Sequence, residues 1–168
     1  MLLDMPTLQR ASLEFVDRAE LVISNEVDLP AHIDEVWAVI ADNSSWPDWF
    51  HGCTHMESSH NPWTAAGQSR TIHVAPFKIR ESAVAIEAPN LWAMQISKTN
   101  LPMANRALEM LELADTSRNG EVRTEIRWTG AFDLPFYLKP AKSIVEMLLL
   151  RNWGPSLENL LDAVIARR

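Results

Sequence analysis

Four histidines fall within a short stretch of the chain, and because imidazole is a common zinc ligand, metal binding is the first chemistry to consider. They are His51, His55, His60 and His73. Gly52 lies between the first two and argues against a helix that would present them on one face. The sequence also shows no nearby carboxylate pattern that would complete three ligands. We therefore interpret the four as loop and strand-end residues, and we predict no metal site and no cofactor.

Nucleophilic and acid–base catalysis have equally little support. Cys53 would need a histidine partner such as His55 or His73 to become reactive, and a buried, inert thiol is the simpler interpretation. The sequence contains no Gly-x-Ser-x-Gly elbow for a serine triad. A general base near neutral pH would have to be a histidine, and His73 is the candidate. However, His73 alternates with Ile72 and Val74, so if those two line a cavity it faces away and the proposal fails.

Two arginines on predicted strands are the best polar anchors for a ligand. Arg70 shares strand parity with Ile72 and Val74, and Arg80 shares it with Val84 and Ile86. A guanidinium at the rim of a cavity can bind a carboxylate or a hydroxyl group. The alternative is that both arginines are strand-end residues that reach water.

Three uncharged polar residues are further candidates for ligand contact. Asn25, Gln95 and Thr124 each fall among apolar residues of a predicted strand. The alternative is that the first two lie at an edge or in solvent and that the third is an ordinary strand residue.

The elements that would position these residues begin with a strand. Between Ala19 and Ala31 apolar residues recur at every second position, which is the strand period. Asp34 and Glu35 then favour the first turn of a short helix that ends near Asp42. Residues 43–52 carry an early proline, which suits a second short helix or turn.

About six more strands are predicted after these helices, separated by turn residues. Their predicted spans are Cys53 to Ser58, Ser69 to Ala75, Phe77 to Glu87, Leu91 to Thr99, Ala104 to Asp115 and Glu121 to Phe132. The pair Asn119-Gly120 is a strong hairpin signal before the last of them. That strand alternates apolar and polar residues, which is typical of a half-buried antiparallel strand.

A long amphipathic helix is predicted from Pro140 to Ile165, where apolar residues return to helical spacing. Pro155 lacks an N–H group and clashes with the carbonyl of Arg151, so we expect a kink near Asn152 or a break at Gly154. The helical spacing of apolar residues continues across the proline, which favours one kinked helix over two separate ones. A curved antiparallel sheet must cover its apolar face, and one long helix can do so. The predicted fold class is therefore α+β.

Composition limits the possible roles. The 168 residues suggest one domain, 19–168, preceded by a loosely attached extension, 1–18, that forms a short lead-in helix or frays. The net charge of −7 opposes binding to nucleic acid or to anionic membrane surfaces. The longest apolar run, Val36 to Ala41, is far shorter than the roughly 20 residues of a membrane span, and the first residues do not read as a secretory signal. A single cysteine excludes an intramolecular disulfide and favours a reducing compartment, so we expect a cytoplasmic protein.

One block of residues carries a family resemblance. It consists of Ala31-His32-Ile33-Asp34-Glu35-Val36-Trp37, then Ala41-Asp42, then Trp46-Pro47-Asp48-Trp49 and Gly52. This block resembles the signature of the START-like (SRPBCC) superfamily, and most closely its polyketide cyclase/dehydrase-like branch. Glu81, in a strand that ends at Pro89, and the carboxy-terminal helix also match that family. The family usually has a proline before the first helix, where this chain has His32 with Pro30 two residues earlier.

The resemblance implies a helix-grip fold, in which a curved antiparallel sheet of about seven strands wraps around the long carboxy-terminal helix, with two short helices after the first strand. It also implies a cavity between sheet and helix that takes apolar or polycyclic ligands. The residues expected to bind the ligand are Trp46, Trp49, Phe50, Arg70, Ile72, Val74, Arg80, Trp92, Met94, Trp128, Leu149 and Trp153. The alternative is that the seven tryptophans and seven methionines fill the cavity rather than line it.

The function expected from this resemblance is the binding or transport of a small hydrophobic molecule such as a lipid, a quinone or a polyketide-like aromatic. One alternative is an enzyme of the polyketide cyclase, aromatase or hydrolase kind that uses the same cavity. Another is a protein interaction module with a closed core and an exposed apolar patch. The expected partner is the small hydrophobic molecule, and the sequence leaves a homodimer open.

Overall fold

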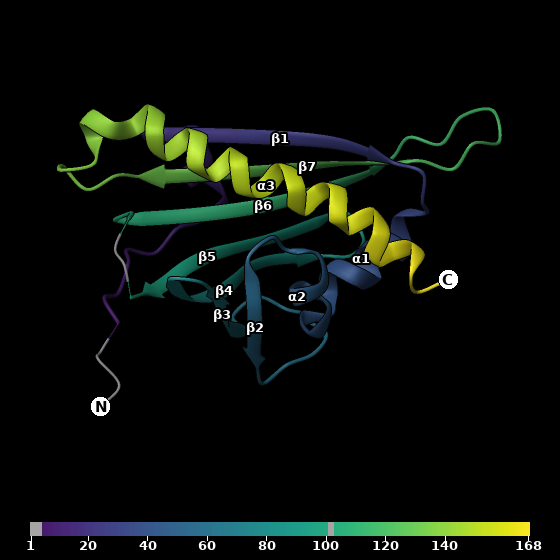
Figure 1. Ribbon diagram of the computed structural model, residues 1–168, viewed down its shortest axis with the longest axis horizontal. Coiled ribbons are helices and arrows are strands. Elements are labelled where there is room, and N and C mark those ends of the chain that lie inside the picture. Colours follow the sequence, from purple (N-terminus) through teal and green to yellow (C-terminus); the bar gives the residue numbers. More distant parts are fainter. Residues whose placement is uncertain (1–4, 101–102) are drawn as a thin grey trace.

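The computed structural model describes residues 5–100 and 103–168, and within them seven strands form one antiparallel sheet (Figure 1). The strands are β1 (Leu21–Leu29), β2 (Cys53–Ser58), β3 (Ser69–Val74), β4 (Phe77–Glu87), β5 (Leu91–Thr99), β6 (Arg106–Asp115) and β7 (Thr124–Asp133). Their order across the sheet is β1-β7-β6-β5-β4-β3-β2, so the first strand pairs with the last. The predicted spans of β2, β4 and β5 are confirmed residue for residue.

Short helices and one long helix complete the chain. They are η1 (Leu13–Asp17), α1 (Ile33–Ala41), η2 (Asn43–Ser45), α2 (Trp46–Trp49), η3 (Lys139–Ala141) and α3 (Lys142–Ile165). The long helix α3 lies over the concave face of the sheet and packs on β1, α1 and α2 (Figure 1). This arrangement confirms the predicted helix-grip α+β fold. In the described part of the chain, no helix is both long enough and apolar enough to cross a membrane.

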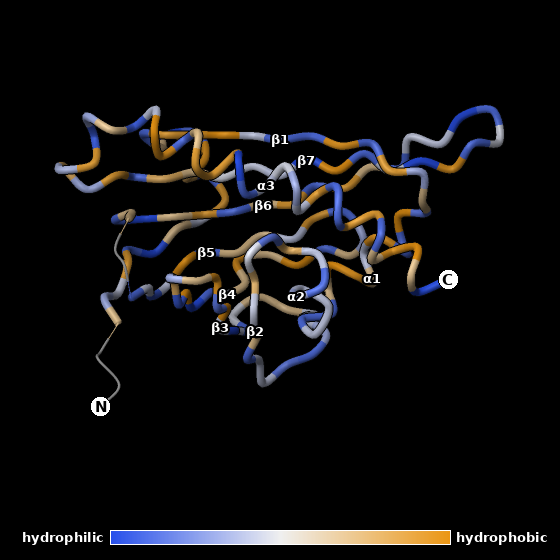
Figure 2. Tube along the Cα trace, in the orientation of Figure 1, coloured by the Kyte–Doolittle hydropathy of each residue, from blue (hydrophilic) through white to orange (hydrophobic). Residues whose placement is uncertain are grey.

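The predicted turn between β6 and β7 is also present. Asn119 and Gly120 have φ angles of 54° and 83°, the left-handed conformation that a tight hairpin turn requires at both central positions. Figure 2 shows hydrophilic residues at this tip and an alternation of hydrophobic and hydrophilic residues along the strands. The turn holds β6 and β7 in register, which aligns the side chains of the two strands on the concave face.

The helix α3 runs without a break through Pro155, so the predicted break at Gly154 is wrong. The reason is packing on both sides of the proline. Trp153, Leu157 and Leu160 are all buried against the same core, so the two halves share one apolar face. In addition, the hydroxyl of Ser156 donates a hydrogen bond to the carbonyl of Asn152 at 2.8 Å.

The described part of the amino-terminal segment first pairs with the end of β5, where Thr7 forms an antiparallel bridge with Lys98, and then covers the convex face of the sheet. Leu8 N–H donates to the carbonyl of Ser97, and Ala11 N–H donates to the side chain of Gln95. Phe15, in η1, is almost fully buried against β6 and β7. The segment therefore forms the lead-in helix of the two alternatives, and Gln95 faces the convex side rather than a ligand.

Candidate functional site

A cluster of aromatic side chains fills the concave face where α2 and α3 meet the sheet. It consists of Trp46, Trp49, Phe50, Trp128 and Trp153, all of them predicted ligand contacts. The rings of Trp128 and Trp153 stack at 4.9 Å, and those of Trp46 and Trp49 lie 4.5 Å apart. The four tryptophans are each 2% exposed or less. The structure thus brings these residues together as predicted, but as a filled core.

Gly130 on β7 allows this packing. A Cβ atom at Gly130 would lie 2.3 Å from Cη2 of Trp153 and 2.7 Å from the ring of Phe132. Both distances are shorter than any real carbon–carbon contact of this kind. The missing side chain therefore lets the indole of Trp153 lie directly against the strand.

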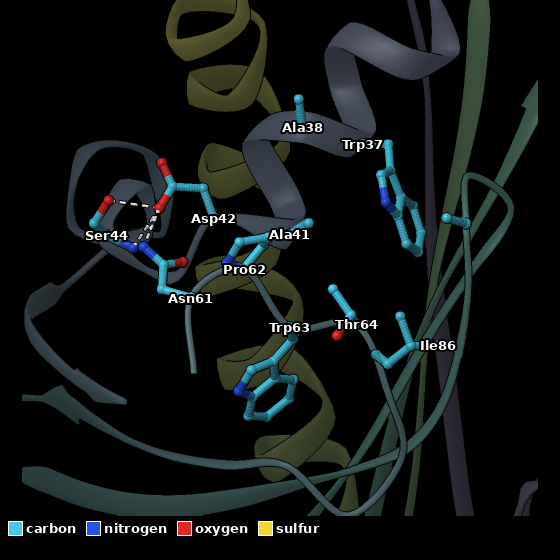
Figure 3. Close-up of a pocket in the computed structure, with 11 residues that line it drawn as sticks. Trp37, Ala38, Ala41, Asp42, Ser44, Asn61, Pro62, Trp63, Thr64 and Ile86 are labelled. Carbon is cyan, nitrogen blue, oxygen red and sulfur yellow. Dashed lines mark hydrogen bonds between the residues drawn. The ribbon is translucent and has the colours of Figure 1, made fainter. Parts of the chain in front are cut away.

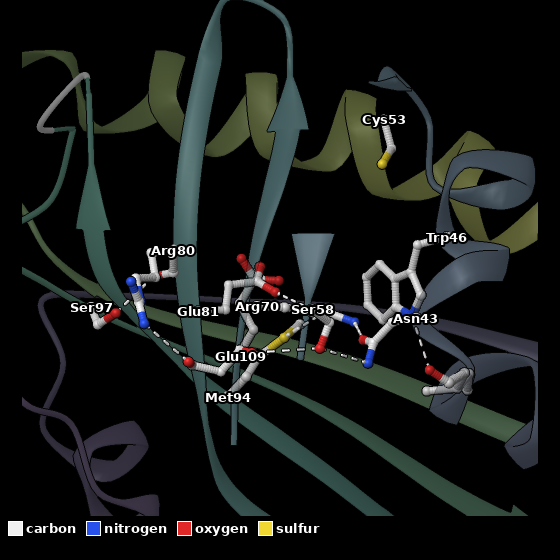
Figure 4. A network of polar contacts seen from close by, with 12 residues as sticks. Asn43, Trp46, Cys53, Ser58, Arg70, Arg80, Glu81, Met94, Ser97 and Glu109 are labelled. Carbon is white, nitrogen blue, oxygen red and sulfur yellow. Dashed lines mark hydrogen bonds and ion pairs between the residues drawn. The ribbon is translucent and has the colours of Figure 1, made fainter. Parts of the chain in front are cut away.

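Arg70 is held in a buried network beside the aromatic cluster (Figure 4). It lies directly opposite Glu81 in the β3–β4 ladder, and its Nε donates to the Glu81 carboxylate at 2.6 Å. Nη1 donates to Asn43 Oδ1 at 2.9 Å, and Nη2 contacts the sulfur of Met94 at 3.3 Å. The guanidinium also lies 3.7 Å from the centre of the Trp46 ring. Arg70 therefore lies on the concave side as predicted, but its donors are occupied and it is 2% exposed, so it acts as an internal support rather than as an anchor at a rim.

The predicted placement of Arg80 is wrong. An irregularity in the β4–β5 ladder between Ala83 and Ala85, where Val84 has no partner on β5, shifts the alternation along β4. Ile86 consequently packs against the core, whereas Arg80 is exposed on the opposite face and donates to a serine hydroxyl at 3.3 Å. Strand parity fails here because a bulge cannot be read from the apolar pattern alone.

The histidine base is also wrong. Ile72 and Val74 are buried in the core, so His73 faces outward, where its Nε2 lies 2.9 Å from Glu57 Oε1. Burial raises the pKa of the Cys53 thiol to about 11, which agrees with an inert thiol. Among residues 5–100 and 103–168, no group of three histidine, cysteine or carboxylate side chains is placed to hold a metal ion.

Glu109 is the ionisable group that the sequence analysis missed. It lies on the concave side of β6, opposite Met94 on β5 and Gly130 on β7. Its Oε2 accepts a hydrogen bond from the indole N–H of Trp128 at 3.1 Å. Burial, reinforced by the negative charge of Glu81, raises its pKa to about 8, although Trp128 and Arg70 act in the opposite direction. Glu109 is therefore mostly a neutral carboxylic acid at pH 7.

The signal for Glu109 was present in the sequence. Glu109 shares strand parity with Ala107, Leu111 and Leu113, all of which are buried. A lone carboxylate on the apolar face of a strand needs either a partner or a function. The same parity argument that selected Arg70 would have selected Glu109 had it been applied to the acidic residues.

The concave face is less tightly covered beyond Glu109. Ile79 on β4 and Ile96 on β5 pack against the core but stay partly accessible, and Glu109 is also only half-buried. The β4–β5 ladder pairs Ile96 with Glu81, and Met94 lies between Ile96 and Glu109 on the same face. We call Ile79, Ile96 and Glu109 the open concave face. Leu149 on α3, another predicted ligand contact, is likewise partly buried against the core.

A separate crevice of about 470 Å³ opens beside α1 (Figure 3). Its lining includes Trp37, Trp63 and Asp42, but none of the twelve predicted ligand contacts. Although burial alone would raise the pKa of Asp42, hydrogen bonds from Ser44, Asn61 and Arg167 hold it at about 2. The charged and amide groups of the crevice therefore bind one another and leave little to orient a ligand.

Most of the remaining predicted contacts are buried in the core or make hydrogen bonds within the protein. Ile72, Val74, Trp92 and Met94 are buried. Asn25 faces the concave side and is half-buried, whereas the hydroxyl of Thr124 donates to the carbonyl of Ala31 at 2.8 Å.

An exposed apolar patch lies at the start of α3 and in the segment before it. Its members are Phe136, Tyr137, Ile144, Met147 and Leu148, each about half exposed or more. Such a patch was the feature expected of an interaction module.

A curved antiparallel sheet that grips a long carboxy-terminal helix defines the helix-grip class of proteins. The chain belongs to the polyketide cyclase/dehydrase and lipid transport family, whose model matches residues 20–167. A search of curated proteins gives no match.

Solved structures share this fold at low sequence identity. The aromatase/cyclase Zhui from Streptomyces sp. R1128 is 18% identical with a TM-score of 0.73, over 88% of this chain and 94% of that chain. Norcoclaurine synthase from Thalictrum flavum, solved with dopamine and hydroxybenzaldehyde, is 14% identical with a TM-score of 0.65, over 96% of both chains. A conserved protein from Geobacillus kaustophilus is 12% identical with a TM-score of 0.70, over 87% of this chain and 96% of that chain.

Proposed function

We propose that the protein binds a small, mostly apolar molecule on the open concave face, next to Glu109. The observation that carries this proposal is a half-buried carboxyl group set among apolar side chains, with a single hydrogen-bond partner among the described residues. Ligand sites in proteins combine such apolar walls with a few polar groups that orient the ligand. The family to which the chain belongs, named for polyketide cyclases and lipid transport, supports the same assignment.

Apolar burial would supply most of the affinity. Ile79 and Ile96 offer aliphatic surface, and the aromatic cluster closes the far side of the site. A two-ring aromatic ligand that buries about 200 Å² gains about 5 kcal/mol at 25 cal/mol per Å², before the cost of immobilising it. By itself this gain corresponds to a dissociation constant of about 0.2 mM, so tighter binding needs a larger buried area or a polar contact, and that contact would also decide the orientation.

The crevice beside α1 is the competing location, and its own polar groups argue against it. Asp42 accepts hydrogen bonds from Ser44 and Asn61 and pairs with Arg167. A ligand would have to break these bonds before it could use them. By contrast, only one oxygen of Glu109 is engaged by the described residues.

A second candidate function is catalysis in the same place, and the pKa of Glu109 is the observation that favours it. A carboxyl group with a pKa of about 8 can both give and take a proton near neutral pH, which is the requirement for general acid–base catalysis. Two proteins that share the fold are an aromatase/cyclase and a synthase. Turnover would then follow binding at the same site, and the ligand must be found first.

The first experiment is native mass spectrometry of the protein purified from its own host, with identification of any molecule that copurifies. A bound apolar molecule in near-stoichiometric amount supports the proposal. The same spectra report whether the chain is a monomer or the homodimer that we leave open. Cell fractionation tests the proposed cytoplasmic location.

A pair of variants then locates the site. Ile96→Phe fills the open concave face, whereas Ala38→Phe adds the same ring to the crevice, from an exposed position on α1. We expect titration with 2-acetylnaphthalene to show at least a tenfold loss of affinity for Ile96→Phe and wild-type affinity for Ala38→Phe. Loss of affinity in Ala38→Phe but not in Ile96→Phe would place the binding site in the crevice. No binding by the wild type would refute the proposed function.

A further inference from the structure

The hydrogen bond of Glu109 engages one of its two carboxyl oxygens and leaves the other, Oε1, without a partner among the described residues. Oε2 accepts the indole N–H of Trp128. The stack of Trp128 on Trp153 fixes the indole, and the indole in turn fixes the plane of the carboxyl group. Since Glu109 keeps part of its accessible surface, we take the Oε1 side as the direction from which another molecule can reach it.

Glu109 has two charged neighbours among the described residues, and the one with the larger effect, Glu81, favours its neutral form. Glu81 on β4 repels a second negative charge, whereas Arg70 on β3 attracts it. The Arg70 donors are already bound to Glu81, Asn43 and Met94, so Arg70 cannot turn toward Glu109. The group facing Glu109 from β7 is Trp128, whose N–H is uncharged.

Resting on the function proposed above, we propose that Glu109 donates the proton of its carboxylic acid to a hydrogen-bond acceptor on the ligand. The ligand is therefore a neutral, mostly apolar molecule that carries an acceptor such as a ketone, quinone or ester carbonyl. An apolar hydrocarbon of the same shape can fill the site but leaves the O–H group without a partner, which costs affinity in a site shielded from water. Above pH 8, where Glu109 is ionised, an anion is disfavoured by its negative charge.

This donor also makes binding depend on pH in a defined sense. The raised pKa, about 8, keeps Glu109 protonated and able to donate at pH 6 to 7. Above that value the group ionises, the donor is lost, and the carbonyl oxygen faces a negative charge. Affinity for a carbonyl ligand is therefore constant below pH 7 and falls as pH rises through about 8. Affinity for the matched hydrocarbon changes less, since it makes no hydrogen bond to lose.

The test compares 2-acetylnaphthalene with 2-ethylnaphthalene, two molecules of similar size that differ in one carbonyl oxygen. Dissociation constants are measured by fluorescence titration at pH 6 and pH 9.5. We expect the ketone to bind about tenfold more tightly than the hydrocarbon at pH 6 and to lose most of that preference at pH 9.5, as a single net hydrogen bond implies.

Two variants and one control complete the design. Glu109→Gln keeps a neutral donor and an acceptor for Trp128, so the ketone preference should survive at both pH values. Glu109→Leu removes the donor, and the preference should vanish at both. Glu112→Gln, on the exposed side of the same strand, should behave as the wild type.

The outcomes separate the two proposals. If neither naphthalene binds the wild type, the proposed function fails. If both bind with equal affinity at pH 6, the site stands but Glu109 is not a donor to the ligand. A ketone preference that survives in Glu109→Leu, or that is unchanged in the wild type at pH 9.5, also overturns the inference.

Discussion

Replacing Glu109 by glutamine should change how the stability of the protein depends on pH. In the unfolded chain the carboxyl group has its ordinary pKa near 4.5, whereas burial raises the pKa to about 8 in the folded protein. Between these two values the unfolded state loses its proton while the folded state keeps it. The wild type is therefore progressively destabilised as pH rises from 4.5 to 8, and the loss is complete above 8.

The size of the effect follows from the two pKa values. Each tenfold change in a protonation equilibrium corresponds to about 1.4 kcal/mol, so a pKa raised from 4.5 to about 8 corresponds to a penalty of about 5 kcal/mol as an upper bound. Relaxation of the structure and water that reaches the half-buried carboxyl reduce this figure, and we expect about 2–4 kcal/mol. Glutamine is neutral at every pH and keeps an acceptor for Trp128, so the variant escapes the penalty.

The assay is urea unfolding of the wild type and Glu109→Gln at pH 5 and pH 9. The difference in unfolding free energy between the two proteins should be small at pH 5 and should favour the variant by about 2–4 kcal/mol at pH 9. The Glu112→Gln control, at an exposed position on β6, should follow the wild type at both pH values. A constant difference between the wild type and Glu109→Gln across this range would refute the claim that Glu109 is neutral in the folded protein.

Three further predictions concern the packing around the site. Gly130→Ala places a methyl group within 2.3 Å of an indole ring and should lower the unfolding free energy by about 1–3 kcal/mol. Gly154→Ala, in a helix, places its methyl group 3.9 Å from the nearest atom and should raise the unfolding free energy by up to about 1 kcal/mol. Thermal unfolding of the two variants decides whether overpacking is the cause. Arg70→Met leaves the carboxylate of Glu81 buried without its partner and should lower the unfolding free energy by about 3–5 kcal/mol. The double variant Arg70→Met with Glu81→Gln should recover most of this loss in urea unfolding. A double variant as unstable as the single one would contradict this account. Asp42→Asn should remove a stabilisation of about 1–2 kcal/mol that is present above pH 4 and disappears as pH falls through about 2, so acid unfolding curves of the two proteins should differ at pH 5 and converge near pH 2.

Periodicity and turn residues were sufficient for most of the fold. Turn residues placed β2, β4 and β5 at their observed bounds, because glycine, proline and asparagine between the strands end each one even where a bulge interrupts the alternation. The helix α3 was also found, but the effect of Pro155 depends on whether buried residues on both sides of it share one face, and that is a property of the packed protein.

The candidate site was less predictable from the sequence. Parity placed Arg70 on the concave side, yet it could not show that Glu81, Asn43 and Met94 occupy its donors. For Arg80, the irregularity at Val84 in the β4–β5 ladder reversed the alternation between Arg80 and Ile86, and nothing in the apolar pattern marks it. The aromatic residues were grouped correctly, but whether rings line a space or fill it depends on contacts as close as that permitted by Gly130.

The arrangement of charges explains why Glu109, and not Glu81, is the carboxyl group available to interact with a ligand. Two carboxyl groups share the concave face with one arginine, and the ladder places Glu81 directly opposite Arg70. The arginine neutralises that carboxylate at 2.6 Å, and its remaining nitrogens are bound to Asn43 and Met94. Glu109 therefore faces apolar surroundings and a second negative charge with only an indole N–H as partner, and it keeps its proton to about pH 8. A neutral glutamine at this position would accept the same indole N–H without the cost of a buried carboxyl group, so the hydrogen bond to Trp128 does not by itself require the acid. A bound molecule that accepts the proton of Glu109 in a hydrogen bond would offset the cost of burying it.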